Sequence, residues 1–265
     1  MPAPTLAQVP EPAVPPEGSP LLQARDVSKR FGGVHALERV TFTLHPGEVV
    51  ALAGDNGAGK STLIKIISGV FRPDEGEIVY EGRTVDFENP QAARDQGIET
   101  IYQDLALADN LDVGANVFLG REPMRRMPHP RWGLPVIDRR QMREAAALAL
   151  EPLDIHLDRL DRPVRALSGG QRQAVAISRA IHWKARVLIM DEPTAALGVP
   201  EQRKVMDLIR SLKGSGVGVI FISHNLGDIF AVSDRIVVLR RGVMAGERAI
   251  GEANPDEIVR LMVGG

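Results

Sequence analysis

The sequence predicts an α/β fold with a mainly parallel β-sheet, an N-terminal antiparallel β-subdomain and an inserted α-helical subdomain. Two runs, 186–190 and 217–223, are uniformly apolar, which is typical of parallel strands that are covered on both faces. A segment with helical apolar spacing separates them, and strands that alternate with helices favour a parallel sheet. The third observation is a glycine-rich turn between the apolar run 49–53 and a helical pattern.

The N-terminal segment 1–20 is rich in proline and alanine and carries too few apolar residues to form a core. We interpret 1–20 as a disordered tail and 21–265 as one folded domain. Short apolar and β-branched runs at 22–24 and 40–44 predict antiparallel strands, which lead into the buried strand 49–53.

The rest of the chain alternates between helical and extended patterns. A helix is expected at 60–69, and 77–85 predicts a strand. The stretch 90–163 is polar and mostly helical, so we interpret about 90–165 as a separate helical subdomain. Three further elements are expected, which are a helix at 168–181, a helix at 200–214 and a strand at 235–239.

Composition excludes several classes of protein. The net charge is only -2, so the chain lacks the strong overall positive charge that is typical of a nucleic-acid binder. Cysteine is absent, which excludes disulfides, thiolate metal sites and cysteine nucleophiles. No apolar run approaches the roughly 18 residues that span a bilayer. If the protein works at a membrane, a partner must supply the span.

A phosphate-binding loop is predicted by the pattern G-x-x-x-x-G-K-[ST]. Its glycines expose backbone N–H groups to triphosphate oxygens, and the following helix directs its positive end at them. Lys60 is expected to reach the β- and γ-phosphates, and Ser61 to ligate Mg²⁺. A chance glycine turn is the alternative, but the strand before the loop and the helix after it favour ATP binding. The nine residues are Gly54, Asp55, Asn56, Gly57, Ala58, Gly59, Lys60, Ser61 and Thr62.

Two carboxylates end the apolar run 186–190. In a parallel sheet the carboxyl ends of the strands line the ligand crevice. Asp191 is therefore expected to hold Mg²⁺, and Glu192 to act as the general base on the attacking water. A solvated strand end is the alternative for such a pair without a phosphate loop. His224 follows the next apolar strand, where it is either structural or in contact with the γ-phosphate.

A second anion-binding helix start is predicted at 167–171, Leu-Ser-Gly-Gly-Gln, which we call the signature. Serine and bare glycine N–H groups at the positive end of a helix suit phosphate oxygens. The signature residues are Ser168, Gly169, Gly170 and Gln171.

With these motifs in this order, the chain resembles the ABC ATPase family over about 21–242. The resemblance implies a P-loop NTPase fold, ATP and Mg²⁺ as ligands, and a head-to-tail pair of chains in which each ATP lies between one phosphate loop and the other signature. It implies that Gln103 contacts Mg²⁺ and the attacking water, that His224 is the switch histidine, and that Phe31 stacks on adenine.

Partners and location also follow from the resemblance. It implies that the helical subdomain docks on transmembrane permease subunits at the cytoplasmic face of the inner membrane, with an external or periplasmic solute-binding protein as an indirect partner. No nucleic acid is expected.

A finer resemblance is to ATPases of bacterial monosaccharide importers, carried by 31–37, the Asp55-Asn56 variant of the loop and 194–199. Many of those have two fused ATPase halves. Gly198 stands where most of the family has an aspartate that helps the subunits communicate, so its replacement bears on coupling between the two sites.

Other functions remain open at this point. An ABC ATPase that acts on nucleic acid or ribosomes usually has two halves or a long coiled-coil insertion, and neither is visible here. A regulator without turnover would not need Glu192, and a P-loop kinase would not use the signature. We therefore expect a transporter ATPase, with a sugar as the transported solute.

Overall fold

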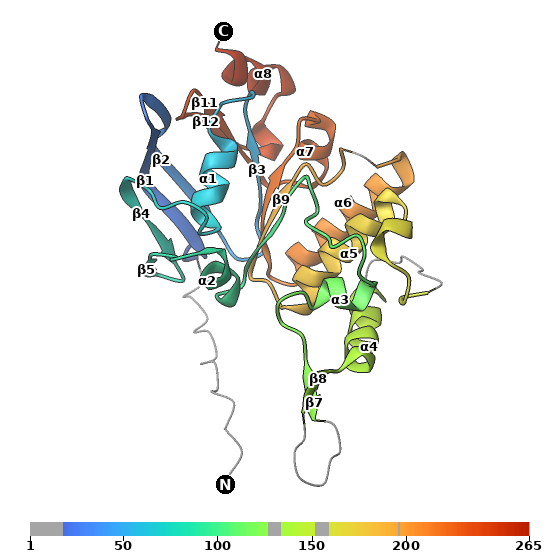
Figure 1. Ribbon diagram of the computed structural model, residues 1–265. Coiled ribbons are helices and arrows are strands. Elements are labelled where there is room, and N and C mark those ends of the chain that lie inside the picture. Colours follow the sequence, from blue (N-terminus) through green and yellow to red (C-terminus); the bar gives the residue numbers. More distant parts are fainter. Residues whose placement is uncertain (1–17, 127–133, 152–158, 196, 265) are drawn as a thin grey trace.

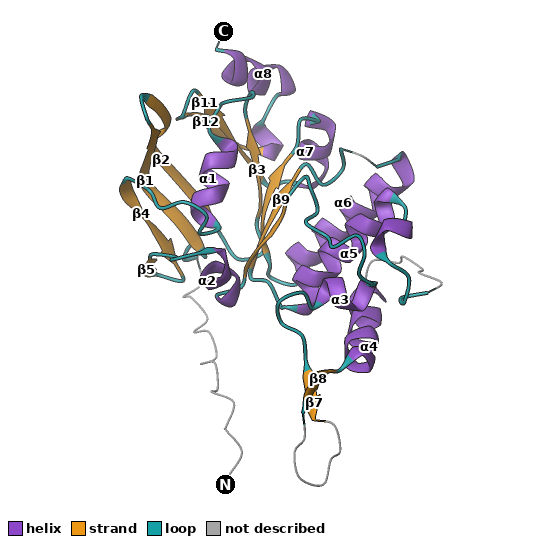
Figure 2. Ribbon diagram, in the orientation of Figure 1, coloured by secondary structure: helices purple, strands orange, loops and turns teal. Residues whose placement is uncertain are grey.

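The computed structural model describes residues 18–126, 134–151, 159–195 and 197–264. The described residues form two larger sheets, a small two-stranded sheet and a group of helices (Figure 1). An antiparallel sheet and the central sheet lie on either side of α1, and most of the larger helices cover the opposite face of the central sheet (Figure 2). The expected disordered tail lies largely outside the described residues.

The central sheet has six strands. Strands β6, β9, β10, β3 and β11 are parallel to their neighbours, and only β12 runs antiparallel, against β11. The predicted mainly parallel sheet is therefore confirmed. In spatial order the strands are β12 (Val243–Ala249), β11 (Arg235–Arg240), β3 (Val49–Ala53), β10 (Gly218–Ile222), β9 (Val187–Asp191) and β6 (Ile98–Ile101).

The N-terminal antiparallel subdomain is also confirmed. It is a four-stranded sheet in the order β2 (Val34–Leu44), β1 (Leu22–Phe31), β4 (Glu75–Tyr80) and β5 (Arg83–Val85). A further hairpin, β7 (Met124–Arg126) with β8 (Pro135–Ile137), projects from the lower edge of the molecule in Figure 1.

The helices predicted at 60–69, 168–181 and 200–214 are present, whereas the two described α-helices after residue 214 were not predicted. The α-helices are α1 (Lys60–Ile67), α2 (Pro90–Asp95), α3 (Val113–Val117), α4 (Arg139–Leu150), α5 (Gly169–His182), α6 (Val199–Gly214), α7 (Leu226–Val232) and α8 (Pro255–Val263), and the 3₁₀ turns are η2 (Val164–Ala166) and η3 (Ile250–Glu252). None of these helices is long and apolar enough to cross a bilayer.

Alternation along the central strands divides the interior into two cores. In β3, Val50 and Leu52 face α1 and the antiparallel sheet, while Val49 and Ala51 face the helices α5, α6 and α7. All four side chains are fully buried. The uniformly apolar composition of these strands thus reflects burial on both faces.

Two sequence expectations were wrong in detail. The segment 77–85 is not one strand, because Glu81 and Gly82 both have positive φ (48° and 76°) and make the tight turn between β4 and β5. The stretch 90–163 is less helical than expected, because 98–101 forms β6 at the edge of the central sheet. The helical subdomain that we infer therefore begins after β6.

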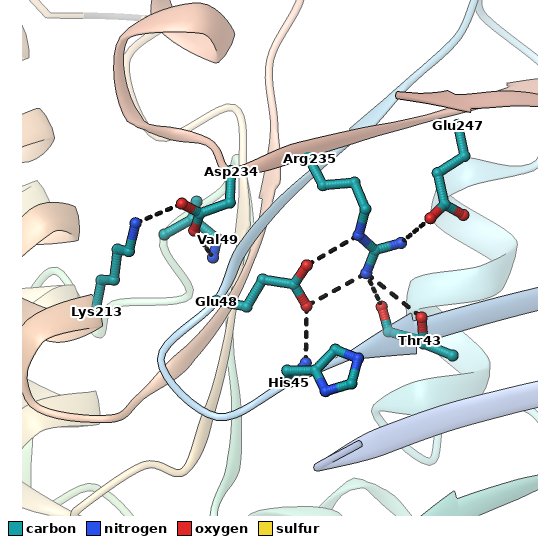
Figure 3. A network of polar contacts seen from close by, with 8 residues as sticks. All are labelled: Thr43, His45, Glu48, Val49, Lys213, Asp234, Arg235 and Glu247. Carbon is teal, nitrogen blue, oxygen red and sulfur yellow. Dashed lines mark hydrogen bonds and ion pairs between the residues drawn. The ribbon is translucent and has the colours of Figure 1, made fainter. Parts of the chain in front are cut away.

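Arg235 joins three strands at the amino end of the central sheet (Figure 3). Its guanidinium donates to both Glu48 carboxylate oxygens, at 2.9 and 3.2 Å, to Glu247 at 2.7 Å and to the Thr43 carbonyl at 2.7 Å. Burial lowers the pKa of Arg235, but the hydrogen bonds and charges of Glu48 and Glu247 outweigh this and hold the pKa above its usual value. This network ties β11 to β2, to β12 and to the turn just before β3, far from the carboxyl ends of the parallel strands.

Replacing Arg235 with methionine is expected to lower the free energy of unfolding by about 2–3 kcal/mol, because the largely buried Glu48 carboxylate loses its charged partner and keeps, among the described residues, only the hydrogen bond from the His45 N–H. The matched control is Arg25→Met, which breaks an exposed ion pair with Glu77 and should cost less than about 1 kcal/mol. Urea unfolding of both variants measures the two costs. Equal costs would show that the Arg235 network adds no more than a surface ion pair.

Candidate functional site

The predicted catalytic motifs meet in one cavity of about 400 Å³ at the carboxyl ends of β3, β9 and β10. The cavity is lined by the phosphate loop, the acid pair, the predicted glutamine and the predicted histidine, which are far apart in the chain. The predicted residues that line the cavity are Asp55, Asn56, Gly57, Ala58, Gly59, Lys60, Ser61, Thr62, Gln103, Asp191, Glu192 and His224.

The loop after β3 needs its glycines for two separate reasons. Gly54 has φ 146°, and a Cβ there would lie 2.2 Å from the carbonyl oxygen of Leu239. Gly59 has φ 108° and is the N-cap of α1, where no side chain caps the helix. The first N–H groups of α1 therefore remain available, and an uncapped helix start of this kind binds anions.

Lys60 reaches over the loop that precedes it. Its ammonium donates to the carbonyl oxygens of Gly54 at 2.5 Å and Asp55 at 3.0 Å. Burial lowers the pKa of Lys60, while the charges of Glu192, Asp191 and Asp55 act in the opposite direction. A partly buried cation beside an uncapped helix start is a strong attractor for phosphate oxygens.

Glu192 has an unusual backbone conformation. It has φ 51°, which is uncommon outside glycine, and its N–H donates to the carbonyl of Ile222 at 3.0 Å. This turn directs the carboxylate into the cavity at the end of β9. Burial raises the pKa of the Glu192 carboxyl, which makes it a better proton acceptor, and His224 partly opposes the shift.

One oxygen of Glu192 has no partner of its own. Oε1 is buried and accepts no hydrogen bond among the described residues. Nε2 of His224 lies 3.3 Å away without meeting hydrogen-bond geometry, and the His224 side chain is 60% exposed. An orphaned acceptor beside a phosphate loop is suited to take a hydrogen bond from water.

Magnesium would find oxygen donors in the same cavity. Ser61, Asp191 and Gln103 all line it, and oxygen ligands are those that Mg²⁺ prefers. Burial raises the pKa of Asp191, while Lys60 lowers it. Within the described ranges no three His, Cys, Asp or Glu side chains gather as a metal site. This donor set suits Mg²⁺ that is held mainly by phosphates and water.

The adenine side of the cavity differs in part from the expectation. Phe31 is not among the lining residues; it is 44% exposed and packs edge-on against Phe71, with ring centroids 5.2 Å apart. Val34, the partner of Phe31 across the β1–β2 hairpin, lines the cavity and is 67% exposed. Stacking by Phe31 therefore stays a prediction, with Val34 beside it.

Sequence reasoning missed the other groups that shape the cavity. His35 and Ala36 line it next to Val34, and their only signal was their position just after Phe31. Asp228 at the start of α7 accepts a hydrogen bond from Thr194 at 2.9 Å. That bond holds the segment after Glu192, and no sequence motif marks it.

The signature does not line this cavity. Ser168 is the N-cap of α5 in a capping box, because its hydroxyl accepts from the Gln171 N–H at 3.3 Å and its own N–H donates to the Gln171 side chain at 3.0 Å. The N–H groups of Gly169 and Gly170 are not part of this box. The chain thus presents a second helix start away from its own phosphate loop.

Comparisons with known proteins identify the class. The ABC transporter family profile matches residues 37–195. The fold is that of two solved ABC-transporter ATP-binding cassettes, one nucleotide-free (26% identity, TM-score 0.76, 93% of this chain and 96% of that one) and one in an ADP conformation (25%, 0.75, 93% and 100%). The chain belongs to the ABC transporter family, as an ATP-binding subunit that hydrolyses ATP for transport.

Within this family the chain is similar to three kinds of import protein. It is 48% identical to the xylose/arabinose import ATP-binding protein XylG of Sulfolobus acidocaldarius, over 92% of this chain and 94% of that protein. It is 47% identical to the fructose import ATP-binding protein FrcA of Rhizobium meliloti, over 84% and 86%. It is 49% identical to the ribose import ATP-binding protein RbsA 1 of Rubrobacter xylanophilus, over 92% of this chain but 47% of that protein.

Proposed function

We propose that two copies of this chain pair head-to-tail and hydrolyse two ATP molecules to drive import of a monosaccharide through a membrane permease. The observation that carries the pairing is the separation of the two anion-binding helix starts. The cavity contains the phosphate loop, the acid pair and His224, but not the signature. A second chain supplies the signature that each cavity lacks.

The chain's own residues account for the chemistry. The N–H groups at the start of α1 and Lys60 hold the β- and γ-phosphates. Mg²⁺, when bound by Ser61, Asp191 and Gln103, neutralises phosphate charge. Glu192 accepts a proton from the attacking water as that water forms its bond to the γ-phosphorus, and ADP and phosphate leave. His224, beside Glu192, contacts the γ-phosphate from the end of β10.

The sugar assignment rests on the import proteins to which the chain is similar. Xylose, arabinose, fructose and ribose are all monosaccharides, and the identity extends over nearly the full length of two of these relatives. The chain spans about half of the ribose relative. We infer a peripheral position at the cytoplasmic face of the membrane, with the permease and an external sugar-binding protein as partners.

Purification of the tagged chain from membranes, followed by mass spectrometry, tests the proposal. A permease with several membrane spans is the expected partner, and the reconstituted complex should take up a pentose or a hexose only with ATP. The Lys60→Ala complex is the control for uptake without hydrolysis. Recovery of ribosomes or nucleic acid in place of a permease would contradict the proposal.

Gly198→Asp is expected to change the Hill coefficient of ATP hydrolysis with little change in stability. Gly198 has φ -70° and ψ 164° at the N-cap of α6, so a side chain causes no backbone strain there. Its Cβ would lie 2.8 Å from Oε2 of Glu201, so the flexible end of that side chain has to move aside. Aspartate is a favourable N-cap, better than glycine by only a few tenths of a kcal/mol. Thermal melts and ATP titrations of the rate separate the two effects. If both stay at wild-type values, the glycine is a neutral replacement.

A further inference from the structure

Glu201 lies between the signature and Gly198. It occupies the first turn of α6, and Gly170 occupies the first turn of α5. A Cβ placed on Gly170 would be 2.6 Å from Cγ of Glu201 and 3.8 Å from its carboxyl carbon. A Cβ placed on Gly198 would be 2.8 Å from Oε2 of Glu201. The side chain therefore packs over one glycine and ends beside the other.

The two glycines thus make room for one carboxylate at two helix starts. The N-terminus of α6 favours the negative charge of Glu201, because the helix dipole is positive there. The same charge lies beside the N-terminus of α5, where Gly169 is exposed and Gly170 is partly exposed. A carboxylate at that place offsets part of the positive potential that an arriving phosphate would meet.

We propose that Glu201 is an electrostatic tuning residue, which weakens the hold of the signature on the nucleotide of the second chain and so lets the ATP-bound pair separate. This inference rests on the proposed head-to-tail pair. Repulsion between the carboxylate and the phosphates acts over several ångströms at the edge of the protein, where each unit of charge changes affinity by several-fold.

Glu201→Gln is the direct test, because glutamine keeps the length of the side chain and its packing over Gly170 but removes the charge. The variant is made in a Glu192→Gln background, so that bound ATP is not consumed. Dimer formation is followed by sedimentation velocity over a range of ATP concentrations with Mg²⁺. The half-saturating ATP concentration is expected to fall several-fold, and the difference should shrink in about 1 M salt, where the Debye length is roughly 3 Å.

Two controls separate charge from packing. Glu88→Gln removes the same charge from an exposed loop residue that lies outside the signature and the nucleotide cavity, and should leave the ATP dependence unchanged. Glu201→Asp keeps a charge near α6 and should stay closer to the parent than Glu201→Gln does. Melting temperatures should change by no more than about 2 °C in each case.

The outcomes are distinguishable. If the Glu192→Gln parent stays a monomer at saturating ATP, the paired-site proposal fails and this inference fails with it. If the parent dimerises but Glu201→Gln needs as much ATP, or more, the proposed tuning role alone is overturned.

Discussion

Lys60→Ala should reduce ATP hydrolysis by about 100-fold or more and weaken ATP binding. The ammonium is the cation at the centre of the phosphate loop, where it bonds to the carbonyls of Gly54 and Asp55. Removing one preorganised donor to developing charge typically lowers kcat by 10²–10³, and this donor also carries a full charge. Steady-state ATPase rates and ATP titration measure the two effects.

The matched control is Lys65→Ala on the same helix. Lys65 lies 5.5 Å from the ring centroid of Phe71 and does not line the cavity. Its removal takes away the same charge and should leave turnover within about two-fold of wild type, because the phosphate loop is untouched. Near-normal turnover of Lys60→Ala would overturn the assignment of the phosphate site.

Glu192→Gln should stop turnover while ATP still binds. The amide has the shape of the carboxylate, so the unusual backbone at φ 51° is kept, but it accepts no proton from water. General-base removal typically costs 10²–10⁴ in rate. Single-turnover assays with radiolabelled ATP separate binding from hydrolysis, since the variant should retain uncleaved ATP. Rapid release of phosphate by this variant would move the role of general base to another group.

Much of the site was predictable because most of its residues belong to short, continuous sequence motifs. Residues 54–62 are expected to act through backbone N–H groups and one lysine, and the acid pair ends an apolar strand, so local sequence is sufficient to locate both. Their meeting in one cavity confirms the expected arrangement of β3 and β9. The roles of the individual residues stay predictions.

The parts of the fold that the sequence analysis missed depend on contacts between residues that are distant in the sequence. Strand β6 has only four residues, and one of them, Glu99, is a buried carboxylate. Arg121 lies 3.8 Å from it, and burial raises the Glu99 pKa. A charged residue in a buried strand breaks the apolar pattern that predicts such strands. Its charge is balanced by Arg121, which lies too far away in the sequence to be seen in a short stretch around Glu99. The turn at Glu81 and Gly82 did carry a local signal.

The close approach of Glu201 to Gly170 was likewise not visible from the sequence, because α5 and α6 are separate elements of the chain. From the sequence, Gly170 is a bare N–H group for phosphate. In the fold it is also the only residue type that leaves room for the Glu201 stem, since a Cβ would lie 2.6 Å from Cγ. The packing of Glu201 within one chain explains the need for room at Gly170. The proposed contact of the Gly170 N–H with phosphate can be tested only when a second chain is present.

Sedimentation velocity of the Glu192→Gln variant shows whether ATP joins two chains. We expect one chain of 28.8 kDa without nucleotide and a particle of twice that mass with saturating ATP and Mg²⁺. Adding Lys60→Ala to the same variant should return it to one chain, because the phosphate loop no longer holds the nucleotide that joins the two copies. A Glu192→Gln chain that binds ATP fully yet sediments as a monomer would contradict hydrolysis at a shared site.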